Sequence, residues 1–312
     1  MTFNDLNTLG KAREPFVFVI DYKAQKIHAF KIDELEDEDI EFSIQENYSF
    51  KKHEHALLTA PLTFESYKKQ FAKVIERIKA GETYILNLTA STKIESHLSL
   101  KEIYSLANAH YKLRFKEKFV CFSPETFIKI EDEKIHTFPM KGTIDASVQN
   151  AQERILADQK EMAEHVMIVD LLRNDLSIVA KNVKVDKFRY ITNVKAGERD
   201  LLQVSSHISG DIATSWHEEI GTILEALLPA GSISGAPKKS TLQIIDGIEE
   251  YERGYFSGVF GFYDGEKLDS AVMIRFIEKQ KKDYCYKSGG GITLDSDPLM
   301  EYEELQNKIY LP

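Results

Sequence analysis

Five apolar residues follow one another in Phe16-Val17-Phe18-Val19-Ile20, and Asp21 ends the run. A run of this length, made of aromatic and β-branched residues, predicts a buried β-strand. The stretch from Lys26 to Ile32 follows after a short turn, and we predict that it is the hairpin partner of this strand. The fold therefore begins with a pair of strands.

Helices separate this pair from the later strands. Thr63 is a predicted N-cap, because apolar residues recur at helical spacing behind it and Gly81 supplies a stop. Ser99 to Glu102 is a predicted capping box. Helices that interrupt antiparallel strand pairs predict an α+β fold. The other predicted elements are strands at Tyr84–Leu88, Phe119–Phe122 and Phe127–Ile130, helices at Ala151–Leu172 and Glu218–Leu228, a hairpin that turns at Asp264-Gly265, and a last helix that begins at Asp297-Pro298.

The composition excludes several classes of protein. The 312 residues are 43% hydrophobic and 29% charged and carry a net charge of −10, which argues against a nucleic-acid binder because such proteins need a basic surface. No apolar run approaches the roughly 20 residues that span a bilayer, and Met1 to Pro15 does not resemble a signal segment. Cys121 and Cys285 lie in apolar stretches without a CxxC motif, which predicts buried thiols. We expect a cytoplasmic protein, folded as a single domain over residues 1–312, that binds neither nucleic acid nor membrane.

Lys141 stands between an apolar run and a Gly-Thr turn, in Thr137-Phe138-Pro139-Met140-Lys141-Gly142-Thr143, and Glu125 precedes it by sixteen positions. Packing gives no reason for a lysine at this place. A lysine amine becomes a nucleophile when burial or neighbouring positive charge lowers its pKa. Most lysines are solvated surface residues, so the other motifs decide between the two interpretations.

Two pairs of carboxylates occur at helical spacing. Glu161 and Glu164 lie three residues apart in the predicted long helix. Glu301 and Glu304 lie three apart in the last helix, with Lys308 on the same face. Together the two pairs would form an oxygen-rich site for Mg²⁺, which takes one or two carboxylates plus substrate and water. Each pair alone is also typical of a solvated helix face.

Three further segments contain groups that bind anions in other proteins. Gly231 to Ser240 does not match GxxxxGK[ST], so we exclude a Walker-type nucleotide site. Gly289, Gly290 and Gly291 have consecutive amides that suit a carboxylate, although a tight turn or bulge would use the same residues. Arg275 is a guanidinium in an otherwise apolar predicted strand, which favours a bidentate carboxylate partner from the substrate or the protein.

In their order along the chain, these motifs resemble those of the chorismate-utilising enzymes. The resemblance runs over residues 62–312, and residues 1–61 form a shortened N-terminal region. It implies a four-layer α/β/β/α fold with two large antiparallel sheets. It also implies Mg²⁺ binding at Glu164 and Glu304, with Glu161 and Glu301 close by. The matching motifs are Gly81-Glu82-Thr83-Tyr84, Ser123-Pro124-Glu125, Glu164-His165 through Arg173-Asn174-Asp175, Leu228-Pro229-Ala230-Gly231 to Lys238, and Ser296-Asp297-Pro298 through Glu304.

The resemblance also bears on the reaction. Isochorismate and salicylate synthases carry a lysine base in the strand after Gly81-Glu82; the matching residue here is Ile85, so hydroxylation at C2 is disfavoured. Anthranilate synthases usually have alanine where Lys141 stands. The Pro-x-Lys-Gly-Thr pattern and Asn87-Leu88 instead resemble aminodeoxychorismate synthase component I. We therefore expect chorismate and ammonia to be converted to 4-amino-4-deoxychorismate, for folate biosynthesis.

The expected mechanism uses a covalent lysine adduct. Lys141 attacks C2 of chorismate while protonated Glu125 donates to the departing C4 hydroxyl, and ammonia then attacks C4 and expels the lysine. Mg²⁺ anchors the ring carboxylate in this scheme. The substrate-binding residues that the resemblance implies are Thr143, His207, Ser234, Tyr263, Arg275, Gly289, Gly290, Gly291 and Lys308.

The resemblance leaves partners and alternatives to be tested. No glutaminase motif is found, so we expect a separate glutamine amidotransferase subunit to supply ammonia. The short N-terminal region lacks the Leu-Leu-Glu-Ser-type element of the family, so tryptophan feedback is not expected. The alternatives are an anthranilate synthase component I and a catalytically silent binding protein that keeps the fold.

Overall fold

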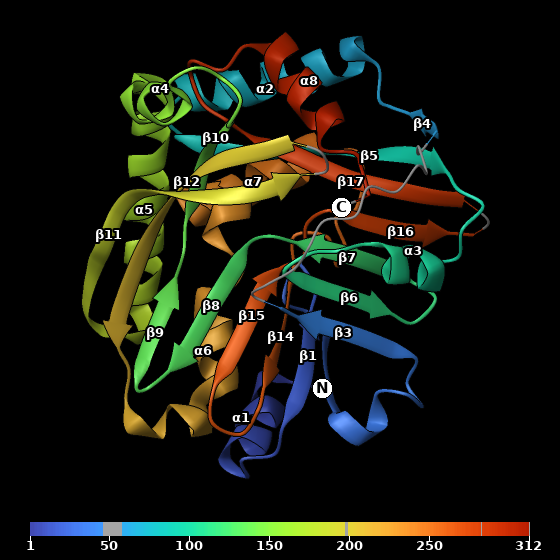
Figure 1. Cartoon of the computed structure of the whole chain (residues 1–312), viewed down its shortest axis with the longest axis vertical. Helices are drawn as coiled ribbons and strands as arrows, with labels where there is room; N and C mark the ends of the chain where they lie inside the picture. Colours follow the sequence, from blue (N-terminus) through green and yellow to red (C-terminus); the bar gives the residue numbers. More distant parts are fainter. Residues whose placement is uncertain (46–57, 197–198, 282, 312) are drawn as a thin grey trace.

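The computed structural model describes residues 1–45, 58–196, 199–281 and 283–311. Two antiparallel sheets, here named sheet A and sheet B, pack on each other, and helices cover their outer faces (Figure 1). This arrangement confirms the predicted α+β fold with four layers. His53 and His55, which we interpret from their lysine- and glutamate-rich surroundings as surface residues, lie outside the described residues.

Sheet A has nine strands within the described ranges, in the order β10-β12-β9-β8-β15-β14-β1-β2, with β11 paired to β12. The first predicted hairpin is confirmed: β1 pairs with β2 from Phe16 opposite Lys31 to Ile20 opposite Ile27. β14 and β15 form the predicted hairpin around Asp264-Gly265. The strands are β1 (Phe16–Ile20), β2 (Ile27–Lys31), β8 (Thr126–Glu131), β9 (Lys134–Thr137), β10 (Met140–Asp145), β11 (Lys181–Ala196), β12 (Arg199–Asp211), β14 (Val259–Tyr263) and β15 (Leu268–Val272).

Sheet B has eight strands in the part of the chain that is described, in the order β13-β5-β17-β16-β7-β6-β3, with β4 paired to β5. β5 and β17 pair from Leu86 opposite Ile292 to Ile94 opposite Tyr284. Tyr84, predicted as the start of a buried strand, precedes β5 and is 63% exposed, so that boundary was wrong. The strands are β3 (Ile40–Ile44), β4 (Leu58–Ala60), β5 (Ile85–Glu95), β6 (Tyr111–Phe115), β7 (Phe119–Ser123), β13 (Gly235–Ala236), β16 (Phe276–Gln280) and β17 (Asp283–Ile292).

β1 is buried on both faces because each face meets a different layer. Phe16 and Phe18 pack into the core between sheet A and its helices, whereas Val19 packs into the core between the two sheets. The inter-sheet core is aromatic; the rings of Phe119 and Phe276, for example, stack with centroids 4.6 Å apart. Each large apolar side chain buried in this way stabilises the fold by roughly 1.5–3 kcal/mol.

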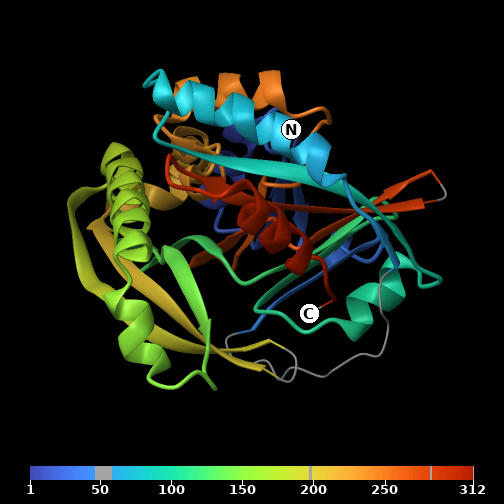
Figure 2. The ribbon, with the colours of Figure 1, turned by 90° about the horizontal axis from the view of Figure 1, so that it is seen from above.

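The helices begin where capping residues predict. Thr63 accepts a hydrogen bond from Ser66 N at the start of α2, Ser99 caps α3 in a capping box, and Asp297 caps α8 ahead of the proline at its first position. Seen from above, α2 lies near α8, and α5 stands at the side of sheet A (Figure 2). The bounds are α1 (Phe3–Lys11), α2 (Phe64–Lys79), α3 (Leu100–Leu106), α4 (Ala151–Ala157), α5 (Gln159–Val179), α6 (Ile220–Leu227), α7 (Lys238–Ile248) and α8 (Pro298–Asn307), with 3-10 turns η1 (Ile32–Glu34), η2 (Thr214–Glu219) and η3 (Gly231–Ile233).

Two predicted helices are divided differently in the structure. The segment predicted as one helix over residues 151–172 forms α4 and α5, because Asp158 takes an extended conformation and its side chain accepts from Glu161 N to cap α5. The segment predicted as a helix over residues 218–228 is the end of η2 followed by α6. The helices α1 and α7 and the long β11–β12 hairpin were not predicted.

Candidate active site

Lys141 lies near the start of β10, which packs against α5. Its Nζ atom is 2.6 Å from Oε2 of Glu164 on α5. The Glu164 side chain is 5% exposed and that of Lys141 is 26% exposed, so the carboxylate is buried while the amine stays partly accessible. Lys160, one helical turn before Glu164, approaches its other oxygen at 3.8 Å. The structure therefore brings the predicted nucleophile against a predicted metal ligand.

His165 holds the backbone of Lys141 in place. Its Nδ1 atom lies 3.3 Å from the Lys141 carbonyl oxygen, and its Nε2 atom lies 2.7 Å from Oγ of Ser206 on β12. The His165 side chain is fully buried, and burial lowers its pKa, so the neutral imidazole is favoured. A neutral ring that donates to the carbonyl and accepts from the serine satisfies both contacts.

The pKa of Lys141 is raised rather than lowered, contrary to the simplest expectation for a nucleophile. Burial, the largest single influence, lowers it, but the ion pair with Glu164 and the charges of Glu304 and Glu161 together outweigh burial. Lys141 is thus held as an ammonium ion by these carboxylates. Its activation requires their charge to be neutralised.

The second carboxylate pair stands on α8, next to the glycine segment of β17. Glu301 accepts from Ser296 Oγ at 2.8 Å, and Glu304 pairs with Nζ of Lys308 at 2.7 Å. A Cβ atom placed on Gly290 would lie 3.4 Å from Oε2 of Glu301 and 3.9 Å from Oε1 of Glu304. The missing side chain at Gly290 leaves these carboxylates room to face the sheet.

The chemistry of the donors fits a divalent cation. Burial, with the negative charges of the neighbouring glutamates adding to it, raises the pKa of both Glu161 and Glu301. Oε2 of Glu161 is buried without a hydrogen-bond partner among the described residues, and it lies 3.0 Å from where Gly142 would carry a Cβ atom. As the side chains stand, no three His, Cys, Asp or Glu residues of the described part converge to metal-ligand distances. A cation held by Glu164 and Glu304 would compete with Lys141 and Lys308, which pair with these two carboxylates here.

Glu125 follows β7 and is positioned by backbone contacts. Its amide donates to Ser123 Oγ at 3.0 Å, and its carbonyl accepts from Val272 N at 3.1 Å. Burial raises the pKa of the Glu125 carboxyl, while a hydrogen bond from Ser232 and the charges of Lys308 and Arg275 lower it by less. The balance favours the protonated acid, as a proton donor requires.

Comparison with known proteins identifies the family. The sequence pattern of the family described as chorismate binding enzyme matches residues 9–311. The chain belongs to the chorismate binding enzyme family. An "Uncharacterized PabA-like protein" of Haemophilus influenzae is 45% identical, with 98% of this chain and 94% of the relative covered.

More distant relatives carry names of specific activities. Anthranilate synthase component 1 of Methanothermobacter marburgensis is 31% identical over 79% of this chain and 56% of the relative. Aminodeoxychorismate synthase component 1 of Bacillus subtilis is 29% identical over 80% of this chain and 55% of the relative. This chorismate binding enzyme thus spans a little over half the length of both relatives.

Solved structures match the fold. Anthranilate synthase component I of Streptococcus pneumoniae superposes with a TM-score of 0.69 at 25% identity, covering 81% of this chain and 58% of that one. The menaquinone-specific isochorismate synthase of Escherichia coli superposes with a TM-score of 0.67 at 18% identity, covering 82% and 63%. In the described part of this chorismate binding enzyme, no helix is both long and apolar enough to cross a bilayer.

The glycine segment of this family member is not the predicted nest of consecutive amides. Gly289, Gly290 and Gly291 belong to β17 and pair with Thr89, Leu88 and Asn87 of β5. Successive amides of a strand point to opposite sides, so the three cannot converge on one carboxylate. The Gly289 carbonyl instead accepts from Nζ of Lys308 at 2.7 Å.

The sequence predicts that Arg275 lies in a strand, and this prediction was wrong. Arg275 occupies the connection between β15 and β16 with a φ of 52°, and its guanidinium lies over the Tyr310 ring, 5.4 Å from the centroid. No internal carboxylate pairs with it within the described ranges, and its Nε atom is buried without a partner there. Apart from a side-chain hydrogen bond with Tyr310, the guanidinium is therefore available to an anionic ligand.

Four other residues expected to bind substrate lie outside this cluster or are already engaged. Thr143 is exposed on β10 opposite Gln203. His207 contacts His136 at 3.0 Å and stacks on Phe138. The Ser234 hydroxyl donates to the Ala230 carbonyl. The Tyr263 hydroxyl donates to the Gly265 carbonyl and contacts His217, in the core beneath η2.

Sequence reasoning missed His165 and Ser232, which support Lys141 and Glu125. His165 directly follows Glu164 in the chain, and a buried histidine beside a carboxylate on a helix is a signal that could have been weighed. Ser232 carries no such signal, because its role depends on a contact with a residue more than a hundred positions away. Ile85, which we expect to match the lysine base of isochorismate synthases, has its Cδ1 atom 3.4 Å from the Cβ position of Gly291.

Proposed function

We propose that this chain is component I of an aminodeoxychorismate synthase, which converts chorismate and ammonia to 4-amino-4-deoxychorismate and water for folate biosynthesis. The observation that carries the proposal is the Lys141 amine, 2.6 Å from Glu164 and under the influence of Glu161 and Glu304. Anthranilate synthases usually have alanine at the matching position. A lysine amine at this place supplies a nucleophile that the ortho amination does not use.

Two residues of the chain carry the bond changes. Lys141, as its free amine, forms a bond to C2 of chorismate, the ring double bonds shift, and the C4–O bond breaks. Glu125 gives its proton to the departing hydroxyl, which leaves as water. Ammonia then bonds to C4, the double bonds shift back, and the C2–N bond to Lys141 breaks, while the proton that the new C4 ammonium group releases returns to Glu125. The net change is exchange of hydroxyl for amine at C4.

Glu164 and Glu304 would hold Mg²⁺, with Glu161 and Glu301 acting directly or through water. When bound there, the ion would anchor the ring carboxylate and neutralise the carboxylates that keep Lys141 protonated. In this proposal Arg275 and Lys308 receive the other carboxylate of chorismate. The Nε atom of Arg275, which is buried and has no partner among the described residues, supports this assignment.

Ammonia reaches C4 from outside this chain in our proposal. The sequence contains no glutaminase motif, so a separate glutamine amidotransferase subunit would release ammonia from glutamine. Ammonium salts at alkaline pH should replace that subunit in vitro.

The second candidate is an anthranilate synthase component I, favoured by one observation: the relative with that name is 31% identical, against 29% for the aminodeoxychorismate synthase. Two percentage points over similar spans do not outweigh the lysine. A catalytically silent binding protein is disfavoured, because Glu125, Lys141 and all four glutamates are present.

Incubation with chorismate, Mg²⁺ and ammonium chloride, followed by chromatography and mass spectrometry of the product, tests the proposal. We expect 4-amino-4-deoxychorismate, with the enolpyruvyl group retained. Anthranilate with released pyruvate would establish the second candidate instead, and no turnover of chorismate would support the silent binding protein.

A further inference from the structure

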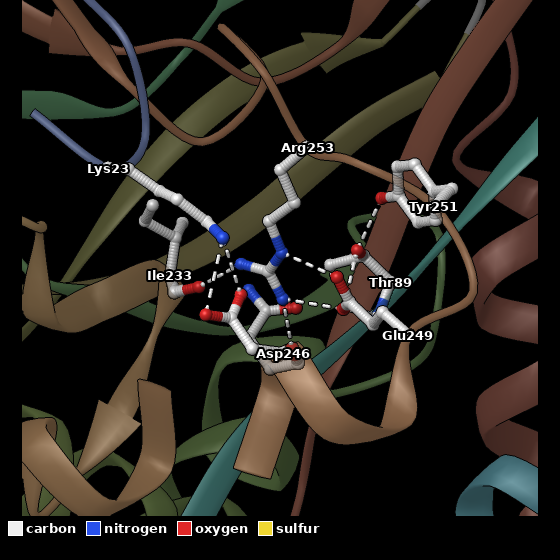
Figure 3. Close-up of polar contacts among 8 residues, drawn as sticks. Lys23, Thr89, Ile233, Asp246, Glu249, Tyr251 and Arg253 are labelled. Carbon is white, nitrogen blue, oxygen red and sulfur yellow. Dashed lines mark hydrogen bonds and ion pairs between the residues drawn. The ribbon is translucent and has the colours of Figure 1, made fainter. Parts of the chain in front are cut away.

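An ion pair with no part in the proposed bond changes lies buried behind the site. The side chains of Glu249 and Arg253 are each 2% exposed. Nε and Nη2 of Arg253 donate to the two oxygens of Glu249 at 2.8 and 2.7 Å, and this bidentate contact is drawn in Figure 3. The guanidinium also lies over the Tyr22 ring, 4.6 Å from its centroid. Both carboxylate oxygens of Glu249 and all three guanidinium nitrogens of Arg253 take part in hydrogen bonds.

The ion pair bonds to backbone groups at the edge of β5, beyond the point where the neighbouring strand β13 ends. β13 pairs with β5 at Ile85 and Leu86 only. Beyond that point the Asn87 amide donates to the Ser234 carbonyl, and the Asn87 carbonyl accepts from Nη2 of Arg253 at 2.7 Å. The Thr89 amide then donates to Oε1 of Glu249 at 2.9 Å. The ion pair thus supplies one donor and one acceptor at the places where a strand would have supplied backbone groups.

Both ends of this arrangement reach the candidate site. Nη1 of Arg253 donates to the Ile233 carbonyl at 3.0 Å, beside Ser232, the partner of Glu125. Asn87 is opposite Gly291 on the other edge of β5, and its buried Oδ1 atom has no partner among the described residues. The same side chains therefore hold the loop that supports the proton donor and the strand that backs the glycine segment.

Stability alone does not account for such a pair. A buried ion pair is often matched or exceeded in stability by apolar side chains of similar volume, because desolvation of two charges offsets their attraction. What apolar side chains cannot replace is the set of directed bonds to Ile233, Asn87 and Thr89. The geometry points to Glu249 and Arg253 as positioning residues, which fix β5 and the η3 loop relative to each other so that Glu125 meets the substrate in register. The kinetic part of this inference rests on the proposed function.

The decisive variant removes both charges at once, Glu249→Leu with Arg253→Met. We expect it to remain folded, with a Tm within a few degrees of the parent, and to lose about 10- to 100-fold in kcat, the range set by a displacement near 1 Å at the reacting groups. The basic limb of its pH profile should also move, because the Ser232 contact to Glu125 is no longer fixed. A folded double variant with parental kcat and pH profile would overturn the inference.

Two further measurements keep the test decisive. Arg253→Lys retains the charge but cannot donate to Ile233, Asn87 and Glu249 together, so it should also lose at least tenfold in kcat if the double variant does not fold; parental kcat in that variant would equally overturn the inference. Asp246→Asn is the control, since Asp246 forms an exposed ion pair with Lys23 in the same region (Figure 3) and should leave kcat unchanged.

Hydrogen exchange separates this inference from the proposed function. The Thr89 amide should exchange faster in the folded double variant than in the parent, and chorismate should bind more weakly by calorimetry, whatever product the parent makes. If the parent makes no aminodeoxychorismate but these two changes occur, the proposed function fails and the positioning role stands. Unchanged exchange at Thr89 and unchanged chorismate affinity would refute the positioning role by themselves.

Discussion

Replacement of Glu125 by glutamine removes the proposed proton donor and little else. Glutamine has nearly the same shape and still bonds to Ser232, but it has no acidic proton to give to the C4 hydroxyl. A positioned general acid contributes about 10²- to 10⁴-fold to a rate, or roughly 3–5 kcal/mol at 1.36 kcal/mol for each tenfold. We therefore expect Glu125→Gln to lower kcat by that factor while the affinity for chorismate changes little.

The pH dependence of the rate is a second test of Glu125 as the general acid. Burial raises the pKa of Glu125 above its ordinary 4.5, so the acid is protonated below the raised value and activity should fall as the pH rises through it. Ser232→Ala removes a hydrogen bond that lowers this pKa, so the falling limb should move to higher pH. Rates are measured with ammonium as the amine donor and expressed per concentration of free ammonia, since that concentration itself rises with pH.

A matched control lies on β8. Glu131 has a side chain 44% exposed and paired with Lys267, so Glu131→Gln should leave both kcat and the pH profile unchanged. A Glu125→Gln variant that turns over chorismate within threefold of the parent, or one that keeps the falling limb, would show that Glu125 is not the acid.

Three further predictions concern the metal, the amine and acid stability. Glu164→Gln or Glu304→Gln should weaken Mg²⁺ binding measured by calorimetry and abolish Mg²⁺-dependent turnover with the fold retained by circular dichroism; undiminished Mg²⁺ affinity would contradict the ligand assignment. The purified chain should aminate chorismate with ammonium salts but not with glutamine alone, and glutamine-dependent turnover would disprove the need for a second subunit. Burial, with a smaller contribution from Arg13, lowers the pKa of His217 to about 4, so the unfolded state binds the proton first as the pH falls. The contribution of His217 to the free energy of unfolding is then fully present above about pH 6.5 and is lost toward pH 4, by at most roughly 3 kcal/mol. His217→Gln should flatten the pH dependence of the free energy of unfolding measured by urea titration, and an unchanged pH dependence would refute its origin in His217.

The fold could be predicted where the signal was local. The run Phe16 to Ile20 and the caps Thr63, Ser99 and Asp297 each act within a few residues, and each was found as predicted. The break at Asp158 escaped prediction because its neighbours on both sides are compatible with helix. The extended backbone of Asp158 and its capping bond to Glu161 show that one helix ends and another begins there.

The long β11–β12 hairpin and the conformation of the glycine segment could not be predicted for a different reason. β11 is rich in charged residues and lacks the apolar run that marks a buried strand, and its order depends on pairing with β12. Three glycines are compatible with a nest, a turn or a strand, and pairing with β5 decides between them. The conformation of such segments is determined by contacts between residues that are far apart in the sequence.

The candidate site was predictable as a set of residue types but not as a geometry. Helical spacing identified the glutamates and the neighbouring sequence identified Lys141, yet neither indicated that Lys141 would contact Glu164 and be held as an ammonium ion. The raised pKa of Lys141 follows from that non-local contact. His165 and the Glu249–Arg253 pair also act through partners on other elements.

The covalent step through Lys141 is the central claim, and the mass of the Lys141 peptide tests it most directly. The enzyme is incubated with chorismate and Mg²⁺ in the absence of ammonia, quenched with acid and digested. We predict that the peptide containing Lys141 gains the mass of chorismate less one water, that ammonium chases this mass away, and that Glu125→Gln shows no gain. An unmodified Lys141 peptide, together with unimpaired amination at C4 by Lys141→Ala, would contradict the covalent mechanism.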